Sequence, residues 1–394
     1  MQQSVKRRAI FFVGGYDPKT PEAFFERMRR EMARFESLWE LKSSFSPVDV
    51  SRDGEIGHVT IETASASPEW SVTTDFHFLV LDKIVLADFA RPLPVRLGKY
   101  LVAFADFVFS GTAFRIFSSA WRFGLYFLFP FVMILLFALL GYVAARLATP
   151  WIGWAGWLVG LAVFATAQAV LGKRWPVNHL MDLWSFSLNF IRGRRPDAEA
   201  LMQRFATVIT AQTAAGNYDE IILVGHSTGG VLMLDFAARC LAIDPQFSTR
   251  AKHVSLLTLG STALKAGYHP AAKPFRQGVQ RLVDDGKLEW VEIQCLTDVI
   301  NLYKTDPVAE MKLRREPGRA FPLIRQVRIK DMLQPETYKR IKRNFFRVHY
   351  QYIFGNTRAY WFDFFQVCCG PTPLLERTEK SIVGALPNLE SKAV

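Results

Sequence analysis

Two long uncharged runs near the middle of the chain restrict its fold more than any other feature. One comprises the 23 residues 123–145, and the other comprises the 22 residues 151–172. A helix of about 20 apolar residues crosses the hydrocarbon core of a bilayer, so each run is long enough to do so. A buried helical pair in a soluble core is the alternative, but cores seldom need two such runs in succession. We therefore predict transmembrane helices over residues 123–145 and 151–172, joined by a tight turn at Thr149-Pro150.

The distribution of basic residues predicts the orientation of this helical pair. Only Arg146 lies in the turn, whereas the outer flanks are strongly basic (Arg115, Arg122, Lys173, Arg174, Arg192, Arg194 and Arg195). Basic flanks stay on the cytoplasmic side of a membrane, so the soluble parts and both termini are expected there. Gly153, Gly156 and Gly160 in the second run would allow close helix packing, within the pair or with another copy of the chain.

Outside the uncharged runs, strand-like segments alternate with helical ones. Continuous apolar character predicts buried strands at residues 9–13, 221–224, 254–259, 288–296 and 324–329. This alternation predicts an α/β fold with a mostly parallel sheet flanked by helices. We expect one soluble domain made of residues 1–85 and 196–370, with residues 86–195 as a membrane-associated insertion and residues 371–394 as a tail. Residues 93–120 mix apolar and charged side chains and are expected to lie along the membrane surface.

A turn with the pattern G-x-S-x-G lies between one of these strands and a helical pattern. It reads Gly225-His226-Ser227-Thr228-Gly229. Glycines on both sides let the backbone take a strained conformation and leave room for neighbouring chain, so the serine hydroxyl stands clear of the sheet edge. The helix start behind the serine offers unpaired N–H groups to an oxyanion. In this context Ser227 is predicted to be a nucleophile rather than part of an ordinary glycine-rich turn.

This strand, turn and helix resemble the nucleophile elbow of the α/β-hydrolase superfamily. The resemblance covers residues 8–80 and 197–355 and implies a serine, an acid and a histidine in that order, the last two in loops after strands. Asp298 follows the strand at 288–296 and is the predicted acid, with Asp306 as the alternative and Asp331 behind it. Of the seven histidines, only His349 lies beyond Asp298, so His349 is the predicted base.

The resemblance also implies an oxyanion hole made of two backbone N–H groups. Thr228, directly after the nucleophile, would supply one, and Gly15 or Tyr16 after the first strand would supply the other. Val13 precedes the glycines, which departs from the His-Gly pattern of many lipases and leaves the identity of the second donor open. Gly260-Ser261 is expected to pack near the site rather than take part in the chemistry.

The expected function is that of a membrane-anchored, lipase-like serine esterase, which cleaves a lipophilic carboxylic ester through an acyl-enzyme. The alternatives are a non-catalytic membrane-tethered scaffold of the same fold, and a thioesterase or peptidase with the same triad. The formal net charge of +12 suits an anionic lipid surface, and no nucleic-acid partner is expected. The sequence contains no phosphate-binding glycine loop, zinc-ligand spacing or dinucleotide fingerprint, so neither a cofactor nor a metal is expected. Cys368-Cys369 are expected to be buried apolar residues.

Overall fold

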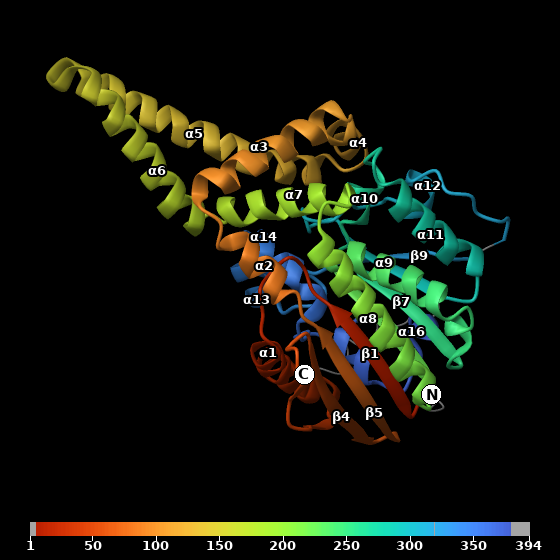
Figure 1. The fold of residues 1–394 in the computed structure, drawn as a ribbon. Helices are drawn as coiled ribbons and strands as arrows, with labels where there is room; N and C mark the ends of the chain where they lie inside the picture. The colour runs from red at the N-terminus through yellow and green to blue at the C-terminus, as the bar shows by residue number, and fades with distance from the viewer. Residues whose placement is uncertain (1–4, 319, 380–394) are drawn as a thin grey trace. The chain divides into compact units, whose positions relative to one another are not determined.

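The computed structural model describes residues 5–318 and 320–379 and divides into two compact units. The sheet unit comprises the described residues of Met1–Lys83, Pro196–Tyr268 and Ala272–Val394. The helical unit comprises Ile84–Arg195 with His269–Ala271. Figure 1 shows the elements of both units. Two segments that are distant in the sequence therefore build the sheet unit, and most of the chain between them builds the helical unit.

In the described residues, nine strands form one sheet (Figure 1). They are β1 (Arg7–Val13), β2 (Lys42–Phe45), β3 (Asp49–Val50), β4 (Ile56–Ala66), β5 (Glu69–Leu79), β6 (Glu220–His226), β7 (His253–Leu259), β8 (Glu289–Cys295) and β9 (Leu323–Val327). Their order is β2-β4-β5-β1-β6-β7-β8-β9, with β3 paired to β4. Only the pairs that involve β4 are antiparallel, and the pairs from β5 through β1 to β9 are parallel. The predicted α/β fold with a mostly parallel sheet is confirmed.

Strands β1 and β6 lie side by side at the centre of the sheet. Every residue of β6 is buried, and so is every residue of β1 after Arg7. Strands covered on both faces carry apolar side chains in succession instead of alternating them with polar ones. This is why the continuous apolar runs in the sequence identified these two strands.

Helices cover both faces of the sheet (Figure 1). On one face lie α1 (Pro21–Trp39) and α15 (Phe364–Cys369), whose Phe24 and Phe364 rings pack on Phe12 of β1. On the other face, α8 (Pro196–Ala215) and α9 (Thr228–Ile243) lie side by side, with the Phe205 and Phe236 ring centroids 5.6 Å apart. The remaining helices of the sheet unit are η2 (Phe247–Thr249), α10 (Ala263–Gly267), α11 (Lys273–Asp285), α12 (Pro307–Glu310), α13 (Pro335–Ile341), α14 (Phe345–His349), η3 (Tyr350–Ile353) and α16 (Leu374–Arg377).

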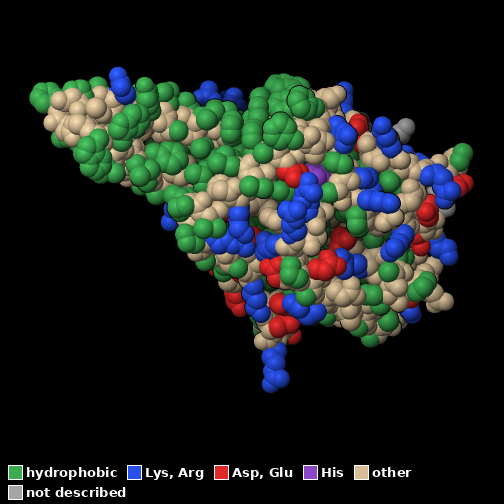
Figure 2. Space-filling model, turned by 45° about the horizontal axis from the view of Figure 1, so that its top comes forward, with side chains coloured by type: hydrophobic (Ala, Val, Ile, Leu, Met, Phe, Trp, Pro, Cys, Tyr) green, Lys and Arg blue, Asp and Glu red, His purple; other side chains and the backbone are tan. Residues whose placement is uncertain are grey.

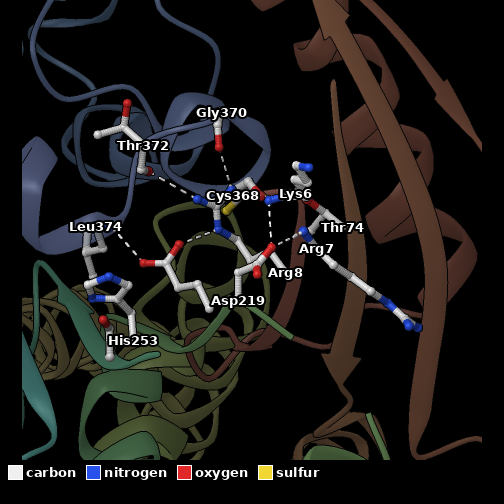
Figure 3. Close-up of polar contacts among 12 residues, drawn as sticks. Lys6, Arg7, Arg8, Thr74, Asp219, His253, Cys368, Gly370, Thr372 and Leu374 are labelled. Carbon is white, nitrogen blue, oxygen red and sulfur yellow. Dashed lines mark hydrogen bonds and ion pairs between the residues drawn. The ribbon is translucent and has the colours of Figure 1, made fainter. Parts of the chain in front are cut away.

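The chain after α15 returns to the first residues of β1, where a buried ion pair holds it (Figure 3). Arg8 Nε donates to Glu220 Oε2 at 2.6 Å, and neither side chain is exposed. The other guanidinium nitrogens of Arg8 donate to the carbonyl oxygens of Cys368, Gly370 and Thr372. Residues 371–379 are therefore packed against the sheet, so the prediction of a tail from residue 371 is wrong for these nine residues. The rest of that tail, 380–394, lies outside the described residues.

The helical unit contains α2 (Asp82–Phe89), α3 (Leu93–Phe109), α4 (Thr112–Ser119), α5 (Trp121–Ile152), η1 (Gly153–Ala155), α6 (Gly156–Arg174) and α7 (Val177–Ile191). Helix α3 packs on α7, because Arg96 of α3 forms an ion pair with Asp182 and Phe107 packs against the buried Trp184. Part of α3 and α4 stays exposed, including Val102, Phe109 and Phe114. Residues 93–120 thus have one packed side within this unit and one exposed apolar side.

Helices α5 and α6 pack closely along their glycines. A Cβ atom on Gly160 would lie 2.5 Å from the Gly141 carbonyl oxygen and 2.7 Å from Ala145 Cβ. The break between the helices is at Gly153, not at Thr149-Pro150, so the predicted position of the turn is wrong. Gly153 adopts φ 57° and ψ −140°, a conformation that residues other than glycine rarely adopt, whereas Pro150 keeps helical geometry inside α5.

In the part of the chain that the structure describes, one helical stretch, Trp121–Arg174, is long and apolar enough to cross a membrane, with a mean hydropathy of 2.5 over an 18-residue window. Helices α3 and α4 would qualify only when taken together across their 70° bend. Figure 2 shows hydrophobic side chains over the surface of α5 and α6. The exposed ones include Leu135, Leu136, Leu139, Leu140, Tyr142, Leu158 and Leu161. Such a surface is unfavourable in water and favourable in hydrocarbon.

Candidate active site

Ser227 stands in a strained backbone conformation between β6 and α9. Its φ of 62° and ψ of −124° lie in a region that non-glycine residues rarely adopt. The neighbouring glycines make the turn possible, because a Cβ on Gly225 would lie 2.4 Å from Gly229 O and one on Gly229 would lie 2.3 Å from Val13 O. The serine itself is partly exposed. Strain held in this way at one polar residue is typical of a nucleophile presented to substrate.

Asp298 and His349 form a buried hydrogen-bonded pair. The Nδ1 and Oδ2 atoms lie 2.7 Å apart, and the side chains are 4% and 0% exposed. Asp298 lies in the loop after β8, where its Oδ1 accepts from the amide of Ile300 and its backbone carbonyl accepts from the Asn301 side chain. A carboxylate only accepts, so Nδ1 of His349 donates to Asp298, and Nε2 is the ring nitrogen that is left for another partner.

The loop that holds His349 is attached to the nucleophile turn. Nε2 of His226, directly before Ser227, donates to the backbone carbonyl of His349 at 3.0 Å. Burial, followed by the nearby His349, lowers the pKa of His226 well below its usual value, so the His226 ring is neutral. Gly260 lies between the parts of the site, since a Cβ there would come within 3.1 Å of both Asp298 Oδ2 and His349 Cε1. Its φ of 51° also favours glycine.

The second nitrogen of the histidine is available for chemistry. His349 Nε2 is buried and has no hydrogen-bond partner within the residues that the structure describes. An acceptor of this kind is open to a water, a ligand or a reacting group. Within the described residues, His349 Nε2 therefore makes no hydrogen bond to Ser227 Oγ. In ligand-free active sites, contacts between a base and a nucleophile are often formed only when substrate binds.

Two backbone segments lie next to the Ser227 side chain. A Cβ on Gly15 would lie 3.5 Å from Ser227 Oγ, so the loop after β1 passes directly beside this serine. Tyr16, the next residue, is buried. Thr228 is the first residue of α9, where N–H groups have no partner within the helix. The backbone at Thr228 and at Gly15 therefore lies next to Ser227.

A buried lysine beside Thr228 was not predicted from the sequence. Lys265 of α10 is 2% exposed, and its Nζ donates to Thr228 Oγ1 at 3.1 Å. Burial lowers the pKa of Lys265 to about 7. No local pattern marks this lysine, because only the fold brings α10 to the start of α9.

The alternative acids are engaged elsewhere. Asp306 accepts from the amides of Val308 and Ala309 and forms an ion pair with Arg315 at 2.8 Å. Asp331 forms an ion pair with Arg328. Of the three acids considered, Asp298 is therefore the one in contact with His349.

Among the described residues, no group of three or more His, Cys, Asp or Glu side chains is arranged to hold a metal ion. The four cysteines are free and buried, including Cys368 and Cys369, which agrees with their expected role as apolar residues. Comparison with protein-family models, with curated proteins and with solved structures finds no match to this chain.

Proposed function

We propose that this protein is a membrane-anchored serine hydrolase of α/β-hydrolase type that cleaves lipophilic carboxylic esters. The observation that carries the proposal is the buried Asp298–His349 pair, 2.7 Å apart, beside the strained Ser227. An uncatalysed serine hydroxyl is a poor nucleophile, and a neutral imidazole oriented by a carboxylate is the standard means of activating it. His349 presents such an imidazole, and its partner acid is fully buried.

The reaction would proceed in two steps. Ser227 Oγ attacks the ester carbonyl carbon while His349 Nε2 takes the serine proton, and the Thr228 amide with that of Gly15 or Tyr16 stabilises the oxyanion. The imidazolium then protonates the departing alkoxide, which leaves as the alcohol. Water attacks the acyl-enzyme by the same route, releases the carboxylic acid and restores Ser227. Asp298 stabilises the imidazolium in both steps.

The apolar stretch Trp121–Arg174 supports attachment to a bilayer and, with it, a lipophilic substrate. Helix α5 is 32 residues long, or about 48 Å at 1.5 Å per residue, and α6 is 19 residues long, or about 28 Å, against a hydrocarbon core of about 30 Å. We propose that both helices cross the membrane. Lys173 and Arg174 in the last turn of α6 would then mark the cytoplasmic side, which both halves of the sheet unit share. Gly160 is occupied by its contact with α5, so self-association through the glycine-rich α6 would use the other faces of that helix.

Active-site labelling tests the proposed chemistry. A fluorophosphonate probe should label the wild-type protein in membranes, and Ser227→Ala should abolish labelling. His349→Ala and Asp298→Asn should slow ester hydrolysis, the latter by about 10⁴-fold if it selects the wrong tautomer. Ser44→Ala, which changes an exposed serine of β2, is the matched control and should label normally. Labelling that persists in Ser227→Ala would leave the non-catalytic scaffold as the better interpretation.

Reporter tags test the proposed topology. A tag in the exposed turn at Arg52 and one in the exposed loop at Gln246 should report the same compartment, and a tag at Gly153 should report the opposite one. Two crossings return the chain to the side on which it started, as the pairing of β1 with β6 in one sheet requires. Tags at Arg52 and Gln246 that report opposite compartments would therefore rule out two crossings.

A further inference from the structure

A narrow pocket opens beside the proposed oxyanion site. The residues that line it include Gly14, Gly15 and His226, together with Arg27 from α1. The enclosed space for water-sized groups is about 20 Å³. One water needs about 10–15 Å³, so the enclosed part admits the end of a small polar group and excludes a long acyl chain.

Aromatic rings hold the guanidinium of Arg27 in place. Its Cζ atom lies 5.3 Å from the ring centroid of Phe24, 5.7 Å from that of Tyr350 and 5.4 Å from that of Phe354. Stacking of this kind uses the face of the guanidinium and leaves the N–H groups at its edge to bind other partners. Because these rings come from α1, η3 and the residue after η3, the position of Arg27 depends on the same segment that follows His349.

The N–H groups of Arg27 are not used within the protein. In residues 5–318 and 320–379, Arg27 makes no hydrogen bond and no ion pair, whereas Arg30 and Arg34 of the same helix pair with Glu26 and Glu31. Burial lowers the pKa of Arg27, yet arginine remains charged at any physiological pH. The guanidinium is therefore preorganised and keeps its donors free.

The acid that lines this pocket does not neutralise Arg27. Asp17 accepts a hydrogen bond from the Tyr350 hydroxyl at 2.7 Å and forms an ion pair with Lys19 at 3.1 Å. Lys19 offsets the charge of Asp17, which leaves the positive charge of Arg27 in excess among the charged residues that line the pocket.

We propose that Arg27 binds an anionic group of the substrate, a carboxylate or a phosphate, so that the enzyme prefers esters with a negative charge close to the scissile carbonyl. The inference rests on the proposed hydrolase function, because the pocket adjoins Gly15 and His226 of that site. A planar guanidinium with free edge donors matches the paired oxygens of either group. The oxygens of the charged group would face Arg27 at the mouth of the pocket, and the acyl chain would extend away from it.

Matched pairs of esters test this specificity in the full-length protein in detergent. 4-Nitrophenyl hydrogen glutarate against 4-nitrophenyl butyrate tests a carboxylate, and a 1-acylglycerol phosphate against the corresponding 1-acylglycerol in mixed micelles tests a phosphate. Arg27→Gln should lower kcat/KM for the charged ester about 10- to 100-fold and leave that for the neutral ester unchanged. Arg27→Lys, which keeps the positive charge but lacks the planar set of N–H donors, should retain part of the preference for the charged ester. Arg30→Gln, which removes an exposed arginine of the same helix, is the control and should match the wild type.

Binding without turnover separates this proposal from the proposed function. Glutaric acid monobutylamide, which cannot be cleaved as an ester, should bind Ser227→Ala as tightly as the wild type and bind Arg27→Gln about 10- to 100-fold more weakly. Uncharged N-butylpentanamide should bind all variants alike. If Arg27→Gln loses the preference for only the carboxylate ester or only the phosphate ester, that group is the one that the pocket accepts. Equal binding and equal ester preference in Arg27→Gln and the wild type would overturn the assignment, whatever the outcome of fluorophosphonate labelling.

Discussion

Replacement of Arg8 by methionine should destabilise the sheet unit far more than replacement of its neighbour Arg7. Arg8→Met keeps an unbranched side chain of similar length but removes the partner of Glu220, which stays fully buried. It also removes the donors to three backbone carbonyls, those of Cys368, Gly370 and Thr372. The substitution thus leaves one buried charge and three buried acceptors without their present partner (Figure 3).

The size of this effect follows from the contacts. Removal of one partner of a buried ion pair costs about 3–5 kcal/mol, because the remaining charge is left desolvated. The loss of the Arg8 donors to Gly370 O and Thr372 O acts in the same direction, whereas Cys368 O keeps a hydrogen bond from Thr74 Oγ1, and such costs are not additive. Arg7→Met removes an ion pair to Asp75 of 3.3 Å in which Arg7 is 51% exposed, and exposed pairs contribute about 0–1 kcal/mol. The total stability of a domain is about 5–15 kcal/mol, so only Arg8→Met should threaten folding.

Urea unfolding in detergent, followed by tryptophan fluorescence, measures the difference. The midpoint should fall strongly in Arg8→Met and hardly at all in Arg7→Met. Limited proteolysis should also show earlier cleavage in residues 371–379 of Arg8→Met, because the amide of Leu374 is held by Glu220 and three nearby carbonyls are held by Arg8. Equal midpoints for Arg8→Met and Arg7→Met would refute the argument that the buried pair secures this segment.

Two further substitutions test buried contacts in each unit. Burial raises the pKa of Glu292 to about 8, so the folded protein keeps a proton that the unfolded chain loses above about pH 4.5, and stability should fall as pH rises through that window. Glu292→Gln should therefore raise the melting temperature at pH 9 but not at pH 4. Glu62→Gln, which changes an exposed residue, is the control, and the same dependence of melting temperature on pH in both variants would contradict the argument. Gly160→Val should separate α5 from α6 at a cost of about 1–3 kcal/mol, because its side chain would meet Gly141 O. Gly98→Val, in open space on α3, is the control, and equal loss of thermal stability in both would contradict the packing.

Most elements of the sheet unit could be predicted because their signals are local. β1 and β6 are continuous apolar runs, and α1 begins with Thr20 as its cap and Pro21 at its first turn. The position of the turn between α5 and α6 could not be predicted in the same way. Proline at 150 is the stronger breaker by local preference, yet packing retains it in the helix and Gly153 makes the turn.

The candidate site was predictable only in part. Ser227 is marked by its own turn, and the order of residues leaves His349 as the remaining histidine, but sequence left Asp298 and Asp306 open as its partner. The structure separates the two acids, since Asp306 caps α12 and Asp298 contacts His349. Arg27 lies in a helical pattern that indicates only an exposed face, so its place near Gly15 had no signal in the sequence.

The sequence by itself determined what depends on neighbours along the chain: the apolar length of residues 123–145 and 151–172, the buried strands, and the glycines that permit the turn at Ser227. The tertiary structure alone decided which distant groups meet, including Asp298 with His349, Arg8 with Glu220, and Arg27 with the pocket beside Gly15. Secondary structure and burial follow from side-chain periodicity within a short window. Contacts between side chains 51 or 212 positions apart depend on the register of parallel strands and on the loops that follow them, which no local pattern encodes.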